Sequence, residues 1–469
     1  MSVASDFVVV SNRLPVDRTD DEAEPCRRSP GGLVTALDPV MRRNDGAWVG
    51  WPGQAGVEIE PFEFDGLRLV PVALSADDIQ LYYEGFSNDT IWPLYHDVIA
   101  TPTYHRTWWD AYVRVNRRFA EAASENAAEG ATVWVHDYQL QLVPKMLREL
   151  RPDVTIGYFH HIPFPAYGIY AQLPWRKQVL EGLLGADVIG FQRVADAGNF
   201  ARAVRRQLGY DTKAGSIAVP EGEGTRTAIA RAYPISIDAS VYEDLARRPD
   251  IQARAAEIRA SLGSPQAILL GVDRLDYTKG IRHRLKAYGE LLSDGRLSVH
   301  DVTLVQVASP SRERVQTYMQ LRDEIELTVG RINGDADELG YTAIQYLHHS
   351  YPREEMVALY LAADVMLVTA LRDGMNLVAK EYVASRVDGG GVLVLSEFTG
   401  AADELTQAIS VNPHDIVGLK DAIMQAIDMP AKERERRMRA LRRRVRENDV
   451  ARWSQRFLTD LDAVRSQRS

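Results

Sequence analysis

The sequence predicts an α/β protein with a doubly wound, Rossmann-like sheet in each half of the chain. Short apolar runs, many of them rich in β-branched residues, alternate with amphipathic segments of helical length in both halves. This alternation is typical of βα units on a parallel sheet. The chain has 469 residues, of which 45% are hydrophobic and 26% charged. That is enough for two or three ordinary globular domains, each with its own core.

Ten apolar runs are the expected strands. In the first half they are residues 7–10, 132–135, 155–159 and 188–191. In the second half they are residues 267–272, 302–307, 343–347, 364–369, 391–395 and 408–411. Such runs suit strands that are buried on both faces of a doubly wound sheet.

The boundary between the predicted domains falls at residues 233–238, where a proline-containing strand exit precedes a charged helical stretch over 240–262. The first domain is expected to span residues 1–236 and the second residues 237–451. Residues 213–227 contain few apolar side chains and are expected to form a short, loose surface hairpin. Residues 432–446 alternate in charge sign without interleaved aromatics, which favours a solvated surface helix over a nucleic-acid patch.

Composition and charge exclude several classes of protein. A formal net charge of −10 argues against recruitment of nucleic acid by the overall field. The single cysteine, Cys26, cannot form an internal disulfide and excludes a cysteine-rich zinc or iron–sulfur module. No stretch approaches the roughly 20 apolar residues of a membrane helix, and the N-terminus lacks a basic signal-peptide region. We therefore expect a cytoplasmic protein that binds neither nucleic acid nor a membrane.

Polar residues that directly follow the predicted strands face the crevice at the carboxyl ends of the sheets, where α/β proteins bind small molecules. In the first half, Arg13 follows the first strand, and His136 with Asp137 and His160 with His161 follow two later strands. Each histidine on its own could be structural, but polar exits from neighbouring strands point to one crevice. The pair Gly31–Gly32 precedes a helical segment and suits the approach of a phosphate, with a plain turn as the alternative.

In the second half, Arg274 and the scarce lysine Lys279 follow one strand, five residues apart, and Arg312 follows the next. Two cations at the mouth of a sheet suit a diphosphate. A glycine-containing strand-to-helix turn over 371–381 exposes backbone N–H groups, and Glu381 near the start of that helix suits a ribose. These features describe a nucleoside diphosphate that carries a polar group; they do not say what is transferred.

Other motifs are absent or unconvincing. The acidic pair Asp335 and Asp337 has the spacing of a metal-dependent sugar-nucleotide site but is expected to lie in a solvated polar loop. Adjacent histidines do not share a helix face as metal ligands do, so we expect no metal and no cofactor. The dinucleotide fingerprint, the Walker P-loop and the G-x-S-x-G elbow are missing, which counts against a dehydrogenase, a P-loop kinase and an α/β-hydrolase.

Seven blocks of the chain resemble the trehalose-6-phosphate synthases. They are residues 8–13, 29–32, 82–93, 136–138, 161–165, 274–280 and 371–381. They occur in the family's order from about residue 7 to Trp453, and the Arg-Asp-Gly-Met-Asn-Leu block is highly specific. The resemblance is closest to the bacterial stand-alone synthases.

The resemblance implies a GT-B fold, with two Rossmann-like domains and the active site in the cleft between them. The first domain would bind the acceptor and be completed by a C-terminal crossover helix, residues 452–469; the second would bind the nucleotide sugar. The implied reaction is retaining, metal-independent transfer of glucose from an NDP-glucose donor (UDP-, ADP- or GDP-glucose) to glucose 6-phosphate, giving trehalose 6-phosphate. A homo-oligomer is expected, as is common in this family.

The resemblance also implies roles for individual residues. The acceptor phosphate would be held by Arg13 and Arg312, with Tyr83 and Trp92 lining its pocket. The donor diphosphate would be held by Gly32, Arg274 and Lys279. The donor sugar and phosphate would contact Asp373, Gly374, Met375, Asn376 and Leu377, and the ribose Glu381. Asp137 and His161 would sit at the sugar ring, with His161 near the donor's C6 hydroxyl. The catalytic set is thus Asp137, His161, Arg274, Lys279 and Asp373.

The family's front-face mechanism passes the acceptor proton to the departing phosphate; Asp373 as a glycosidase-type nucleophile is the less favoured alternative. Gly168 departs from the family's usual glutamate and leaves the local loop uncertain. The main rival function is a pseudo-glycosyltransferase that couples an NDP-cyclitol to an amino-cyclitol phosphate. A catalytically dead sugar-phosphate sensor and a pyridoxal-dependent phosphorylase are further alternatives. The intact set of Asp137, His161 and Asp373 favours the synthase.

Overall fold

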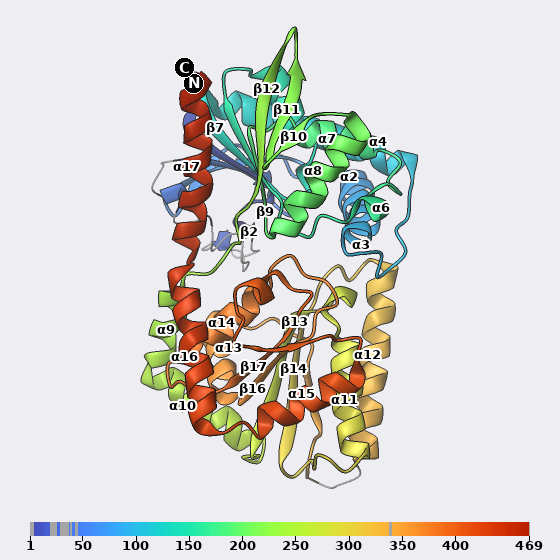
Figure 1. Ribbon diagram of the computed structural model, residues 1–469, viewed down its shortest axis with the longest axis vertical. Helices are drawn as coiled ribbons and strands as arrows, with labels where there is room; N and C mark the ends of the chain where they lie inside the picture. The colour runs from blue at the N-terminus through green and yellow to red at the C-terminus, as the bar shows by residue number, and fades with distance from the viewer. Residues whose placement is uncertain are drawn as a thin grey trace. The chain divides into compact units, whose positions relative to one another are not determined.

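A computed structural model of the protein describes residues 4–18, 26–28, 37, 40–42, 46–336 and 340–468. The chain divides into two compact units (Figure 1). Unit 1 is Met1–Ile235 together with Val450–Ser469, and unit 2 is Ser236–Asp449. Each unit is built around one predominantly parallel sheet with helices packed on it.

The main sheet of unit 1 has ten strands among the described residues, in the order β10-β11-β12-β9-β8-β7-β1-β4-β6-β5. Their bounds are β1 Ser5–Arg13, β4 Ala47–Trp51, β5 Phe62–Phe64, β6 Leu67–Pro71, β7 Ala127–His136, β8 Thr155–Phe159, β9 Val188–Phe191, β10 Thr212–Lys213, β11 Ser216–Glu221 and β12 Gly224–Ala232. All pairs from β12 to β6 are parallel, and the two edges are antiparallel hairpins. A separate ribbon pairs β2 (Val16–Arg18) with β3 (Cys26–Arg28).

The four strands predicted for this half are confirmed, but the prediction was incomplete. It missed β4 and β6, which extend the sheet beyond β1. The expected loose hairpin over 213–227 is wrong in extent, because the ordered β10–β12 hairpin reaches Ala232 and joins the central sheet. Four parallel pairs between β12 and β9 fix it there, from Ile229 opposite Val188 to Ala232 opposite Phe191.

The helical segments of unit 1 are α2 Ala76–Asp78, η1 Ile79–Ile91, α3 Trp92–Tyr95, α4 Arg106–Asn126, η2 Tyr138–Leu140, α5 Val143–Leu150, α6 Tyr167–Tyr170, α7 Arg176–Leu183, α8 Val194–Leu208 and α17 Val450–Arg468. The last of these, α17, lies in unit 1 although it follows all of unit 2 in the sequence. Its Phe457 is fully buried and stacks on Trp134, with ring centroids 4.6 Å apart. Gly157 and Gly190 leave room for that ring, since a Cβ on either would lie within 3 Å of it.

The sheet of unit 2 has six strands among the described residues, all parallel, in the order β15-β14-β13-β16-β17-β18. Their bounds are β13 Ala267–Arg274, β14 Val302–Ser309, β15 Ile344–Leu347, β16 Val365–Val368, β17 Val392–Ser396 and β18 Ile409–Val411. All six strands predicted for the second half are confirmed.

The helical segments of unit 2 are α9 Ala239–Arg247, α10 Pro249–Ser261, η3 Tyr277–Lys279, α11 Ile281–Ser293, α12 Gln316–Asp335, α13 Arg353–Ala362, α14 Leu377–Ser385, η4 Gly400–Asp403, α15 Ile416–Ile427 and α16 Ala431–Glu447. The single helical stretch expected over 240–262 is in fact two helices. Pro249 forces the preceding residue, Arg248, into an extended conformation, which ends α9 and starts α10. The surface helix expected over 432–446 is confirmed as α16.

Both sheets reverse their strand order next to the first strand of the unit. In unit 1 the reversal lies between β1 and β7, and in unit 2 it lies between β13 and β16. The loops that leave two such neighbouring strands run in opposite directions and leave a crevice at their carboxyl ends, where doubly wound proteins bind ligands. The fold therefore singles out the exits of these four strands.

Candidate functional site

In unit 2 the exits of β13 and β16 are joined by an ion pair. Lys279 Nζ, in η3 after β13, lies 2.6 Å from Asp373 Oδ2, in the loop after β16. Both side chains are largely buried, with 13% and 14% of their surfaces exposed. Arg274 ends β13 and is exposed at the same edge of the sheet. The structure thus brings together the cations and the carboxylate that the sequence placed at these strand exits.

The loop after β16 is an ordered turn built around Asp373. Asp373 Oδ1 accepts a hydrogen bond from Met375 N (3.4 Å) and Oδ2 accepts one from Asn376 Nδ2 (3.2 Å). Asn376 has a left-handed backbone with φ of 76° and caps α14 through a hydrogen bond from Ala379 N. A non-glycine residue in this region is strained by about 1–3 kcal/mol, and such strain gathers at functional sites. The turn from Gly374 to Leu377 leads directly into the amino terminus of α14.

The loop after β13 is organised by a buried carboxylate, Asp276. Its Oδ1 accepts hydrogen bonds from the backbone N (2.9 Å) and the hydroxyl (2.8 Å) of Thr278, which starts the 3₁₀ turn that carries Lys279. Leu371 N donates to Thr278 O (2.7 Å) and so joins this loop to the exit of β16. Asp276 lies within the block 274–280 that resembles the family, but its role in ordering this loop could not be predicted from the sequence.

The other oxygen of Asp276 holds Arg312. Arg312 Nη1 and Tyr318 Oη each lie 2.9 Å from Asp276 Oδ2. The side chain of Arg312 is only 5% exposed, and its backbone is left-handed, with φ of 48°. Burial alone would raise the pKa of Asp276, but the nearby cations, with Arg312 the strongest, hold that pKa below its ordinary value. In this structure the expected acceptor-phosphate arginine is therefore engaged by an internal carboxylate.

Glu381 lies in α14, as expected, but its carboxylate is also engaged. Tyr360 Oη donates a hydrogen bond to Glu381 Oε2 at 2.9 Å. Burial raises the pKa of Glu381, partly offset by hydrogen bonds from Tyr360 and Tyr242. One carboxylate oxygen of Glu381 is therefore already oriented by an aromatic hydroxyl.

In unit 1, Arg13 ends β1, where the strand's register against β4 shifts. Its guanidinium carbon lies 5.0 Å from the ring centroid of Trp51, and the Trp51 and Tyr83 rings are 6.0 Å apart. A Cβ on Gly53 would lie 2.5 Å from Arg13 Nη2, so that position leaves room for the guanidinium. The sequence-based prediction missed Trp51 together with its strand, β4. The apolar run over 47–51, followed by Pro52, is the sequence signal that predicts this strand.

Trp92 is buried at the start of α3, and only 4% of it is exposed. Its ring lies 4.1 Å from that of His96 and 5.6 Å from that of Tyr138, measured between centroids. Tyr138 Oη in turn donates to Asn88 Oδ1 at 2.8 Å. Trp92 thus connects the segment 82–93 to the exit of β7, where Asp137 lies.

Asp137 and His161 meet at the exits of β7 and β8. Asp137 Oδ1 accepts hydrogen bonds from the backbone N of Tyr138 (2.9 Å) and of His161 (3.2 Å). The backbone of Asp137 has φ of 76° and ψ of 170°, a region that non-glycine residues rarely adopt. The strained backbone and the half-buried carboxylate of Asp137 thus lie together at this strand exit.

His161 is paired with a second histidine, His136, and both follow predicted strands whose exits were expected to face one crevice. His161 Nε2 and His136 Nδ1 lie 3.0 Å apart. Burial lowers the pKa of His161 to about 3, and burial together with His161 holds the pKa of His136 well below its ordinary value. Both imidazoles are therefore neutral near pH 7, so that one must donate a hydrogen bond to the other, which limits the tautomers that His161 can adopt.

The remaining expectations have mixed outcomes. Gly31 and Gly32 lie outside the described residues. The expectation that Asp335 lies in a polar loop is wrong, because Asp335 is the last residue of α12. Asp337 lies outside the described residues. Within the described part of the chain, no group of three or more His, Cys, Asp or Glu side chains could hold a metal ion. The described helices include none that is both long and apolar enough to cross a membrane.

Comparison with known proteins gives consistent matches over nearly the whole chain. The model of glycosyltransferase family 20 matches residues 5–463. A trehalose-6-phosphate synthase of Mycobacterium avium (strain 104) is 58% identical over 468 residues, 97% of this chain and 95% of that protein. A solved UDP-forming trehalose-phosphate synthase from Burkholderia xenovorans, in complex with glucose 6-phosphate, matches with a TM-score of 0.89 and 35% identity over 97% of this chain and 99% of that one. A solved E. coli structure bound with UDP-2-fluoro glucose matches with a TM-score of 0.89 and 34% identity. The match covers 97% of this chain and 98% of that one.

These matches confirm the fold class and the resemblance inferred from the sequence. The two parallel-sheet units have the GT-B fold of the matched structures, and the protein is a glycosyltransferase. The family model covers both units and reaches into α17. The chain belongs to glycosyltransferase family 20.

Proposed function

We propose that the protein is a trehalose-6-phosphate synthase, which transfers glucose with retention from a nucleoside-diphosphate glucose to glucose 6-phosphate. The observation that carries this proposal is the Lys279–Asp373 pair, at the strand-order reversal of unit 2 and beside a turn of backbone N–H groups. The names of the matched relatives support it, as do their ligands, glucose 6-phosphate in one structure and UDP-2-fluoro glucose in another.

Unit 2 would bind the donor. Arg274 and Lys279, with Gly32 of unit 1, would hold the diphosphate, and Glu381 the ribose. Negative charge develops on the diphosphate as the glycosidic bond breaks, and fixed cations stabilise that charge more in the transition state than in the ground state. Lys279 is already fixed by Asp373, so it needs little reorganisation, and this step requires no metal or cofactor.

Asp373 would recognise hydroxyls of the donor sugar, with Gly374, Met375, Asn376 and Leu377 beside it. A glycosidase-type nucleophile needs a free oxygen aimed at the anomeric carbon. Here Oδ2 contacts Lys279 and Asn376, and Oδ1 accepts from Met375 N. That geometry favours the front-face route, in which the acceptor hydroxyl passes its proton to the departing phosphate and the same face of the sugar is attacked.

Unit 1 would bind the acceptor. Arg13 would contact the phosphate of glucose 6-phosphate, with Tyr83 and Trp92 lining its pocket and Arg312 of unit 2 as the second phosphate ligand. Asp137 would accept a hydrogen bond from a sugar hydroxyl. The neutral His161 would hydrogen-bond the donor's C6 hydroxyl, and its pairing with His136 supports a fixed orientation for that bond.

The test is nucleotide release by the purified protein with glucose 6-phosphate and, in turn, UDP-, ADP- and GDP-glucose in EDTA. We expect release that depends on the acceptor, with trehalose 6-phosphate as product, and the preferred donor identifies the base. Release that does not depend on the acceptor contradicts the proposal. No release with any donor also contradicts it and favours the cyclitol-coupling or regulatory alternative.

Variants connect the activity to the site. Arg274→Ala and Lys279→Ala should each lower kcat by at least a hundredfold, the usual effect of removing a preorganised group that stabilises transition-state charge. Arg282→Ala and Lys286→Ala are matched controls, because both side chains lie on the neighbouring helix α11 and are about half or more exposed. Near-normal turnover in Arg274→Ala or Lys279→Ala would refute the role of that residue.

A further inference from the structure

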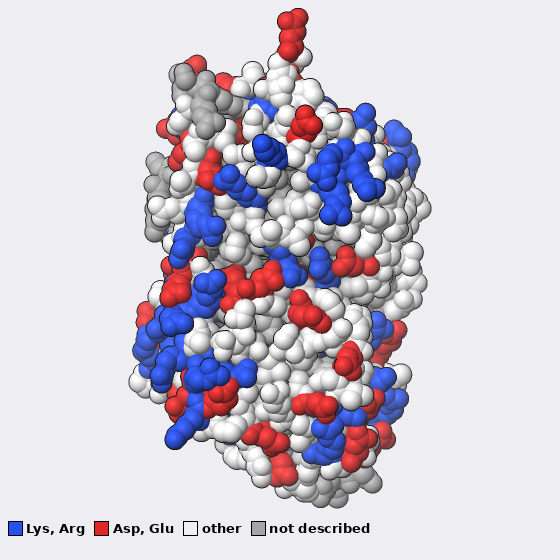
Figure 2. Space-filling view, in the orientation of Figure 1, with Lys and Arg blue, Asp and Glu red and all other residues white. Residues whose placement is uncertain are grey.

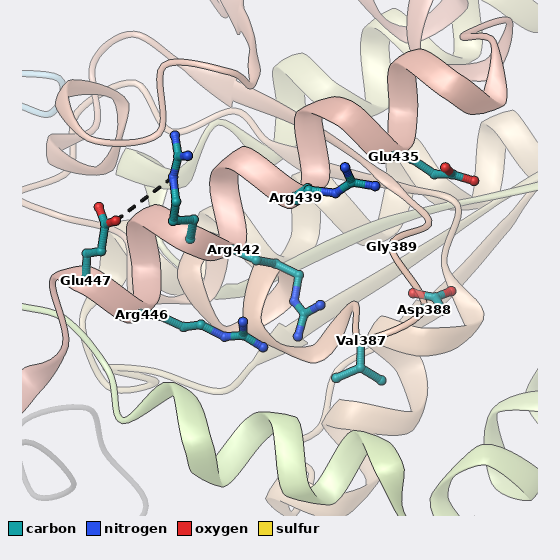
Figure 3. A pocket seen from close by; sticks show the side chains of 9 residues that line it. Val387, Asp388, Gly389, Glu435, Arg439, Arg442, Arg446 and Glu447 are labelled. Carbon is teal, nitrogen blue, oxygen red and sulfur yellow. Dashed lines mark ion pairs between the residues drawn. The ribbon is translucent and has the colours of Figure 1, made fainter.

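A cavity of about 760 Å³ lies within unit 2, between α16 and the loop 387–389 that follows α14 (Figure 3). No residue that we assign to the donor or the acceptor lines it. Arginines 439, 442, 443 and 446 line it from α16, and their spacing of three and four residues places them on one side of the helix. Figure 2 shows Lys and Arg side chains gathered over this helix.

Arg442 is the buried member of this group. Its side chain is 14% exposed, and its Nε and Nη2 are buried and donate no hydrogen bond within the protein. Nη2 lies 3.3 Å from Glu243 Oε1, close enough for an ion pair but without hydrogen-bond geometry. Burial lowers the pKa of Arg442, but a guanidinium stays charged at neutral pH. Glu243 therefore supplies the counter-charge of Arg442, whereas the hydrogen-bonding capacity of its guanidinium is only partly satisfied within the protein, which is costly for a buried charged group.

The acidic groups nearby are largely taken by other cations. Asp388 forms a bidentate pair with Arg386, with distances of 3.1 and 2.8 Å. Glu447 lies 4.0 Å from Arg443. Glu243 accepts hydrogen bonds from Arg446, one of them at 2.9 Å, and from Arg247 at 3.2 Å.

Arg439 is the exposed member of the group. It forms no ion pair or side-chain hydrogen bond within the described part of the chain, and Figure 3 shows it projecting from α16 toward the loop 387–389. Among the four arginines of this cavity, Arg439 is therefore the one without an acidic partner in the described part of the chain, whereas Arg442, Arg443 and Arg446 each have one. Glu435 also lines the cavity.

We propose that this cavity is a binding site for a small phosphate anion, either inorganic phosphate or a phosphate monoester. A guanidinium presents parallel N–H donors that match two phosphate oxygens, and the exposed guanidinium of Arg439 stands at this cavity beside three further arginines. The volume is that of a small-molecule pocket, which favours a compact anion over a polymer. The site is separate from the donor and acceptor sites and does not depend on the proposed activity.

The test is isothermal titration calorimetry of the full chain with inorganic phosphate and with glycerol 2-phosphate, at constant ionic strength in chloride. Wild type should bind at least one of the two, and comparing them distinguishes free phosphate from a phosphate ester as the occupant. Arg439→Gln and Arg442→Gln should each weaken that affinity at least tenfold, since each removes charge-assisted hydrogen bonds. If Arg442→Gln does not fold, the exposed Arg439→Gln carries the test.

Two controls separate this site from other cations. Arg436→Gln makes the same change on α16 at a 63% exposed arginine that does not line the cavity, and it should bind phosphate as wild type does. Arg274→Ala should also retain the binding, because Arg274 belongs to the candidate donor site. Equal loss in Arg436→Gln, unchanged affinity in Arg439→Gln, or binding of heparin but of neither small anion would overturn the proposal.

Discussion

Asp276→Asn tests the network that joins the two candidate phosphate sites. In the wild type, one oxygen of Asp276 caps the turn that carries Lys279, and the other pairs with Arg312. The asparagine oxygen can still cap that turn through Thr278, but its amide group cannot accept from Arg312 or from Tyr318. The substitution therefore removes the ion pair and leaves the cap.

The magnitude follows from burial. The side chains of Asp276 and Arg312 are 0% and 5% exposed, so the variant leaves a buried guanidinium without its counterion. Removing one partner of a buried pair costs about 3–5 kcal/mol. We expect the free energy of unfolding of unit 2 to fall by that amount. Glucose 6-phosphate should stabilise the variant more than the wild type, because its phosphate would replace the lost carboxylate beside Arg312.

Urea unfolding measures this effect. All eight tryptophans belong to unit 1, so a change seen by far-UV circular dichroism but not by tryptophan fluorescence belongs to unit 2. Asp415→Asn, at the exposed cap of α15, is the matched control and should change stability by less than 1 kcal/mol. The double variant Asp276→Asn/Arg312→Leu should recover most of the loss. A loss below 1 kcal/mol in Asp276→Asn, or no recovery in the double variant, would refute this reasoning.

Three further predictions follow. Phe457→Ala should lower the free energy of unfolding by about 3–5 kcal/mol, because the ring is fully buried; a change below 1 kcal/mol in tryptophan-detected urea unfolding would show that α17 is dispensable. Burial lowers the pKa of His160 to about 3, so on acidification the unfolded chain binds a proton at this residue before the folded chain does. His160 therefore contributes stability that is fully present above about pH 6.5 and falls by about 1.4 kcal/mol per pH unit toward pH 3. His160→Gln should reduce that acid slope and His105→Gln, at an exposed site, should not; equal slopes would contradict the assignment. Arg312→Ala should raise KM for glucose 6-phosphate in initial-rate assays, and an effect confined to the donor KM would mean that Arg312 has been misplaced.

Most of the buried parallel strands could be predicted from the sequence, but β4, which is buried along its whole length, was missed together with the partly exposed edge strands of unit 1. Central strands such as β8 and β17 are buried on both faces, so they form unbroken apolar runs between turn residues. Strands β5 and β11 are partly exposed and have no such run. The hairpin's place in the sheet depends on backbone pairing between β12 and β9, which side-chain patterns do not encode.

The candidate site likewise contains residues that could be predicted from the sequence and residues that could not. Residues at the exits of buried strands, such as Asp137 and Lys279, could be predicted because their positions follow from the strands. The partners that fix the site could not. Asp276 contacts Tyr318 across 42 residues, and Arg312 contacts Asp276 across 36. Such pairs depend on the packing of separate loops, and the local sequence carries no sign of that packing.

The return of the chain to unit 1 has a consequence for biosynthesis. Helix α17 is translated only after the whole of unit 2, because the chain leaves unit 1 at Ile235 and re-enters it at Val450. While the ribosome makes unit 2, the face of the first sheet that carries Trp134 and Phe159 lacks the cover that Phe457 later provides. Unit 2 can fold as a continuous segment on the ribosome, whereas unit 1 must wait with an aromatic surface open to aggregation and to chaperones. The discontinuous unit 1 therefore cannot complete its fold until the whole of unit 2 has been translated.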